Sequence, residues 1–239
     1  MKAWGVFIGL IGFAALILGL LPGGSSQGAA SLGIDDDFND GLIDFKKQSF
    51  VFRRGDVEGA MVGTILETDQ RLVFTLNPSV KEVHADAFAA CSLAGDFDVQ
   101  VDYALLDWLP DNKIKLGLLA HDLLFNRTAG SVQRVSDGSR GGEIYLAHFL
   151  DGIRGVTPTS DLAGKLRLTR TGSTMTAFVF DGDAFVAIHS GPTTANPVRL
   201  SLALFTSKPT PGGKVAFDNL TVNSGKLACP QRESQNEGQ

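Results

Sequence analysis

The acidic side chains of this sequence are the first place to look for catalysis, and they lack the arrangement of a hydrolytic pair. Hydrolysis of a glycosidic bond needs two carboxyl groups placed across the bond that is cleaved. Asp98 and Asp102 alternate with Gln100 along one stretch, but alternating polar residues are typical of any half-exposed strand. Glu143 has no identifiable partner. The sequence therefore favours binding over catalysis, with an unrecognised acid pair as the alternative.

Three further kinds of function are disfavoured by motifs and by charge. The sequence contains no G-x-S-x-G motif of a serine hydrolase, and its four histidines include no i, i+4 pair of the kind that binds zinc. The formal net charge is -5, whereas binding to nucleic acid requires clustered Lys and Arg. The sequence thus predicts no organic cofactor and no nucleic-acid partner.

An aromatic and basic set of residues is the best candidate for a binding surface. Sugar recognition uses aromatic faces together with polar groups beside them. Trp108 follows a predicted strand and precedes a Pro-Asp turn, and Tyr145, His148 and Arg154 lie further along the chain. These four residues are predicted to bind ligand. The alternative is that Trp108 and Tyr145 fill the core or cap its edge.

The acidic run at residues 35–41 is similar in composition to a calcium loop but differs from an EF-hand. Counted from Asp35, the loop glycine is Gly41 at position 7 rather than 6. Position 12 is Lys46, where an EF-hand needs a bidentate glutamate. The run is therefore not an EF-hand, and a solvated turn before the first strand is one interpretation of it.

Alternation of apolar and polar residues predicts an all-β domain. Residues 97–103 and 165–170 alternate with the two-residue period of a strand, and Asp181–Gly182 is a strong hairpin signal. Ten or more short predicted strands are separated by Gly- and Pro-rich turns, which is typical of an antiparallel two-sheet β-sandwich, or jelly roll. We expect one such domain over residues 31–225, followed by a polar disordered tail at 226–239.

The N-terminus predicts export. Residues 3–21 contain no charged side chain, and small residues continue to Ala29–Ala30. This apolar helix over residues 1–30 is predicted to be a signal peptide, or an uncleaved signal anchor because its length approaches that of a membrane span. The protein would then be secreted, periplasmic or on the cell surface, and would contact a membrane only through an uncleaved N-terminal segment.

The two cysteines are predicted to form a disulfide. Cys91 and Cys229 both lie in the part of the chain that would be exported, and thiols pair in oxidising compartments. A Cys91–Cys229 bridge would fasten the C-terminal end to the body of the domain. Two buried free thiols are the alternative.

Four short motifs resemble the concanavalin A-like lectin/glucanase superfamily, the broad group that includes laminin G and laminarinase domains. DDFNDG at residues 36–41 and VAFDNLTV at residues 215–222 resemble its first and last strands. GDFDV at residues 95–99 and GKLRLTRTG at residues 164–172 also resemble that group. The resemblance implies an antiparallel sandwich whose first and last strands lie side by side.

The resemblance also implies a structural calcium ion near that junction and a carbohydrate-related function. Asp218 is the best candidate ligand, with Asp36 or Asp37 or nearby backbone carbonyls completing a cage of oxygen atoms. Because no acid pair is recognised, the leading hypothesis is a non-catalytic extracellular module that binds a glycan or cell-surface polysaccharide. The alternatives are a secreted glycoside-active enzyme and a structural or adhesive surface protein.

Overall fold

The computed structural model describes residues 35–40, 48–55, 57–152 and 154–229. The predicted N-terminal helix and signal segment at residues 1–30 lie outside these residues. Within the described part of the chain, no helix is long and apolar enough to cross a membrane.

The described residues form a 14-stranded sheet whose strand pairs are all antiparallel, together with two short 3₁₀ turns. The strands are β1 (Gln48–Arg54), β2 (Val57–Glu58), β3 (Gly63–Thr68), β4 (Arg71–Leu76), β5 (Val83–Asp107), β6 (Lys115–Asp122), β7 (Arg127–Asp137), β8 (Gly142–Phe149), β9 (Arg154–Pro158), β10 (Ala163–Thr171), β11 (Thr174–Phe180), β12 (Phe185–Pro192), β13 (Val198–Thr206) and β14 (Gly213–Ala228), and the turns are η1 (Gly138–Arg140) and η2 (Leu150–Gly152).

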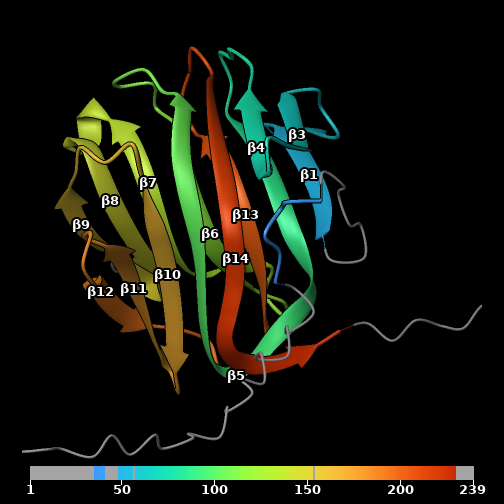
Figure 1. Cartoon of the computed structure of the whole chain (residues 1–239), viewed down its shortest axis with the longest axis vertical. Coiled ribbons are helices and arrows are strands. Elements are labelled where there is room, and N and C mark those ends of the chain that lie inside the picture. Colours follow the sequence, from blue (N-terminus) through green and yellow to red (C-terminus); the bar gives the residue numbers. More distant parts are fainter. Residues whose placement is uncertain (1–34, 41–47, 56, 153, 230–239) are drawn as a thin grey trace, which may run out of the picture. The chain divides into compact units, whose positions relative to one another are not determined.

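Strand β5 belongs to two layers, and it turns the single sheet into a sandwich. Its first half pairs with β1 and β13, giving a first layer in the order β2-β1-β5-β13-β6-β7-β8-β9. Its second half pairs with β14 and β10, giving a second layer in the order β3-β4-β14-β5-β10-β11-β12. In Figure 1, β9 and β12 lie on one side and β1 and β3 on the other, as expected if the two layers face each other.

The change of layer occurs at Gly95. Its φ of 65° lies in the left-handed region, which glycine adopts without steric cost. The buried side chain of Arg170 donates a hydrogen bond from Nε to the Gly95 carbonyl at 2.6 Å, and the Gly172 amide donates to the Asp96 carboxylate at 2.7 Å. Strand β10 therefore holds the bend of β5 in place.

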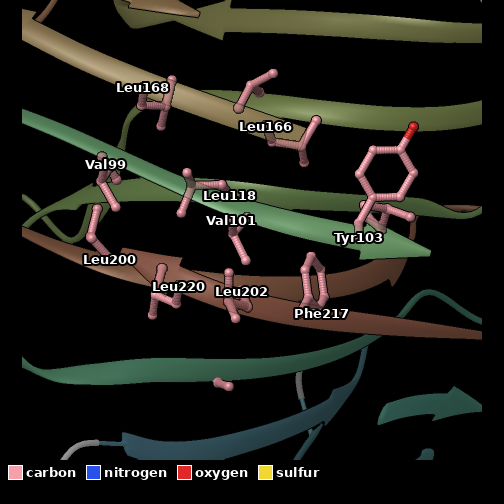
Figure 2. Close-up of a cluster of buried hydrophobic side chains, with 14 of the residues drawn as sticks. Val99, Val101, Tyr103, Leu118, Leu166, Leu168, Leu200, Leu202, Phe217 and Leu220 are labelled. Carbon is pink, nitrogen blue, oxygen red and sulfur yellow. The ribbon is translucent and has the colours of Figure 1, made fainter. Parts of the chain in front are cut away.

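The hydrophobic core lies between the layers. Along β5 every second residue points inward, so Val99 and Val101 meet the leucines of β13, including Leu202 (Figure 2). Phe217 of β14 packs edge-on against Phe74 of β4, with ring centroids 5.2 Å apart. In the strands of the first layer, the side chains that alternate with these core residues face away from the core.

The two ends of the domain meet as the sequence predicts. Asp36 forms a β-bridge with Leu220, through backbone hydrogen bonds of 3.0 and 2.9 Å. The predicted disulfide between Cys91 and Cys229 is present. One boundary differs: β14 continues through Ala228, so residues 226–228 belong to the sheet and not to the tail expected from residue 226. Pairing of these residues with β5 explains the extension.

Candidate functional site

A groove of about 530 Å³ lies on the outer face of the first layer. Its floor comes from the residues of β5, β6 and β13 that alternate with the core-facing ones. On β5, for example, Val83, Ala85 and Ala87 face the core, while His84 and Phe88 line the groove. The neighbouring strands place their groove-facing side chains in rows across this floor.

The first row is aromatic and basic. The register sets Phe205 of β13 beside His84 on one side and beside Lys115 of β6 on the other. The His84 ring stacks on Phe205 at 5.1 Å, and Lys115 Nζ lies 5.2 Å from the same ring centroid. Burial, together with the nearby Arg53, lowers the pKa of His84 to about 4. The imidazole is therefore neutral at neutral pH.

A second aromatic and basic cluster lies four residues further along β5, at Phe88. Arg199 lies 5.0 Å over the Phe88 ring, and it donates hydrogen bonds of 2.7 Å to the Ala89 carbonyl and to Ser49 Oγ. The His121 ring is 5.2 Å from Phe88. Burial lowers the pKa of His121 to about 4, with smaller contributions from nearby arginines. Both clusters thus hold a cation against an aromatic ring next to a neutral histidine.

Between these clusters the floor carries small residues and one buried acid. The register aligns Asp86, Ala203 and Gly117 across β5, β13 and β6. A Cβ at Gly117 would lie 2.8 Å from Cγ of Gln133, so this side chain covers the glycine. Asp86 is 3% exposed, and its Oδ2 has no hydrogen-bond partner in the described part of the chain. Burial raises the pKa of Asp86 to about 6, although Arg53 opposes the shift.

The charge of the groove is opposite to that of the chain. Two carboxylates occur among the lining residues, Asp86 and Asp122, and Asp122 accepts hydrogen bonds from Asn196 and from the Leu124 amide. Five cations line the same groove: Arg53, Lys115, Arg140, Arg154 and Arg199. In a chain of net charge -5, this concentration of cations gives a local field that attracts anions.

The four residues predicted to bind ligand are divided between the groove and the core. His148 and Arg154 are cross-strand neighbours on β8 and β9 and line the groove. Tyr145 is buried, and its hydroxyl bonds with Tyr103 at 2.7 Å and Asp161 at 2.8 Å. Trp108 packs against the core. Tyr145 and Trp108 therefore lie in the core and at its edge, which was the alternative to ligand binding for these two rings.

The remaining groove residues were not predicted from the sequence, although one alternating pattern indicates some of them. Residues 83–89 read VHADAFA, in which valine and alanines alternate with His84, Asp86 and Phe88. A strand with one small apolar face and one face of imidazole, carboxylate and aromatic groups is suited to line a site. The basic residues come from four other strands and from the η1 turn, and no local pattern links them.

Two of the residues proposed for calcium, Asp36 and Asp218, belong to the segments that meet at the β-bridge between Asp36 and Leu220. No group of three or more His, Cys, Asp or Glu side chains that could hold a metal occurs in the described part of the chain. Both carboxylate oxygens of Asp36 accept hydrogen bonds, from the Phe38 amide and from Gln48 Nε2. Burial raises the pKa of Asp218, and the nearby Asp102 and Asp37 carboxylates add to this rise. Calcium binding by Asp36, Asp37 and Asp218 therefore stays a prediction of the resemblance. If a chelator lowers the melting temperature of the protein, calcium binding is supported. If the melting temperature stays the same with chelator, calcium binding is rejected.

Comparison with known families identifies the domain. Residues 42–237 match the model described as "Protein of unknown function (DUF1583) C domain". The chain belongs to this family. No curated protein matches the sequence.

The fold of this DUF1583 C domain is that of the concanavalin A-like lectins and glucanases, as the motifs predicted. LamAcat from Zobellia galactanivorans has a TM-score of 0.58 and 12% identity, covering 82% of this chain and 98% of its own. Alginate lyase AlyC3 in complex with dimannuronate has a TM-score of 0.56 and 8% identity, and the match covers 78% of this chain and 91% of the lyase. The Emp46p carbohydrate recognition domain, in a potassium-bound form, has a TM-score of 0.52 and 11% identity, and the match covers 78% of this chain and 97% of the Emp46p domain. Similar folds thus occur both in carbohydrate-recognition domains and in enzymes.

Proposed function

We propose that this DUF1583 C domain is an exported, non-catalytic module that binds an acidic polysaccharide in the groove of its first layer. The observation that carries the proposal is the set of five cations lining a groove whose two carboxylates are both buried. Guanidinium groups recognise carboxylate and sulfate oxygens through paired, charge-assisted hydrogen bonds. A ligand with regularly spaced negative groups would engage several of these cations at once.

The chemistry of the lining residues supports binding more than hydrolysis. Asp122 accepts hydrogen bonds from Asn196 and from the Leu124 amide. Asp86 therefore has no second free carboxylate among the groove residues with which it could form a catalytic pair. The faces of Phe88 and Phe205 already contact cations and imidazoles, so electrostatic attraction rather than sugar stacking would supply most of the affinity.

Two further observations support the ligand class and the location. A protein of this fold, the alginate lyase, was solved with dimannuronate, an acidic sugar. The Cys91–Cys229 disulfide favours an oxidising compartment such as the periplasm or the exterior of the cell.

Neutralising the exposed cations of the groove is expected to weaken binding. Arg53 and Arg154 are exposed, and each replacement by glutamine removes one charge-assisted contact, worth about 1.5 kcal/mol, or roughly a tenfold loss of affinity. Arg71→Gln, on the second layer outside the groove, is the matched control and should bind as the unchanged protein does. Calorimetric titration with oligouronates measures the effect.

The same titration tests the proposal as a whole. Oligouronates should bind, neutral β-glucan oligosaccharides should bind far more weakly, and affinity should fall as salt is added, since screening weakens attraction between exposed charges. Equal affinity for neutral and acidic sugars, or no binding of either, would overturn the proposal. Release of shortened or unsaturated products during the titration would replace it with an enzymatic function.

A further inference from the structure

Asp86 has an unusual position for an acid in a groove that attracts anions. It occupies the middle row of the floor, between the Phe205 cluster and the Phe88 cluster, and beside the small residues Ala203 and Gly117. The side chain is 3% exposed, and among the residues that the structure describes Oδ2 has neither a hydrogen-bond donor nor an ion-pair partner. A buried carboxylate in this state costs free energy that a proton would remove.

The groups that face Asp86 come from every neighbouring strand. Arg53 lies on β1, His84 on β5 itself, Lys115 and His121 on β6 and Arg199 on β13. Of these groups, Arg53 is the one that opposes the rise in the pKa of Asp86, and no ion pair between the two is present. An anionic chain lying across the floor would draw Arg53 away from Asp86 and would repel the ionised form of Asp86.

We propose, on the basis of the function proposed above, that Asp86 is protonated when the groove is occupied and donates its O–H hydrogen bond to a carboxylate of a uronate unit, so that ligand and proton bind together. The proton comes from solvent, and the two carboxyl groups then share it without any covalent change. Asp86 thereby becomes a specificity residue for carboxylated sugars.

The direction of the pH dependence follows from the free protein. The pKa of Asp86 is about 6, so at pH 8 the protonated form is a small fraction, and each further pH unit makes it tenfold rarer. Affinity for a carboxylated ligand is therefore highest well below pH 6, is about half of that value at pH 6, and falls further above it. His84 and His121, with pKa values of about 4, stay neutral throughout this range and add no proton.

The test is the dissociation constant of a defined oligouronate between pH 5.5 and pH 8, measured on the whole protein. The unchanged protein is expected to bind about 50-fold more weakly at pH 8 than at pH 6, and to take up close to one proton per ligand at pH 8 in calorimetry with buffers of different ionisation heat. Asp86→Asn keeps the shape, carries no charge, and donates from its amide. It should abolish most of this pH dependence and bind at pH 8 at least as tightly as the unchanged protein.

Asp183→Asn is the matched control, because Asp183 lies in the exposed turn before β12 and does not line the groove. This variant should keep the full pH dependence. A pH-independent affinity in the unchanged protein overturns the inference. So does an Asp86→Asn variant that binds weakly at every pH, since ionised Asp86 would then be accepting a hydrogen bond from a sugar hydroxyl. Both results leave acidic-glycan binding intact, whereas no binding of the oligouronate at any pH would defeat the proposed function itself.

Discussion

Replacing Glu143 by glutamine is expected to lower the free energy of unfolding by about 3 kcal/mol, because it leaves the buried charge of Arg134 without a counter-charge. Arg134 is 1% exposed, and its Nη1 lies 2.5 Å from Glu143 Oε2. Glutamine keeps one carbonyl oxygen as the acceptor for Trp108 Nε1, and its amide nitrogen can donate to Ser136 Oγ, so both contacts persist while the charge is removed. Urea denaturation measures the loss.

A second variant distinguishes a lost charge from damaged packing. In Arg134→Met/Glu143→Gln the buried cation is gone together with its partner, and replacing a whole ion pair costs less than breaking it. The double variant should therefore be more stable than Glu143→Gln alone. The exposed Glu58→Gln is the surface control and should stay within about 0.5 kcal/mol of the unchanged protein. A double variant less stable than the single one would show that packing of Arg134, including its position 5.9 Å from the Trp108 ring, matters more than its charge.

Much of the fold could be predicted because it depends on local patterns. The alternation at residues 97–103 and at 165–170 marked the paired strands β5 and β10, and the motifs around Asp36 and Leu220 marked the bridge between the chain ends. The length of β5 could not be predicted in this way. Its 25 residues include the bend at Gly95, which in isolation is typical of a turn and which Arg170 holds from a distant strand.

The candidate site could be predicted only in part, and strand β8 shows why. Its sequence GEIYLAHF is apolar on both faces, so alternation does not reveal which face meets the core. The period of two does show that Tyr145 and His148 point to opposite faces, and hence that they cannot share one binding surface. The clustering of Arg53, Arg199 and Lys115 depends on pairing between strands far apart in sequence.

Removing the disulfide is the second change with a large expected effect. Cys91 and Cys229 are 138 residues apart, and a cross-link over so long a loop restricts the unfolded chain strongly. The chain-entropy model assigns about 5 kcal/mol to such a loop, and native disulfides typically contribute about 2–5 kcal/mol. Cys91→Ala/Cys229→Ala should therefore unfold at a clearly lower urea concentration than the oxidised protein.

The reduced, unchanged protein provides the control for the two lost sulfur atoms. Because Cys91 packs within the core cluster, alanine at this position also removes buried volume, whereas reduction does not. Reduction should thus account for most of the loss, and a reducing agent should have no effect on the double variant. The end of β14 is also hydrogen-bonded to β5 through the pair Ala228–Ser92 and its neighbours, so we expect strand pairing to keep this end in place after reduction. If reduction left the urea midpoint unchanged, the bridge would not constrain the unfolded chain, and strand pairing alone would hold the C-terminal end in place.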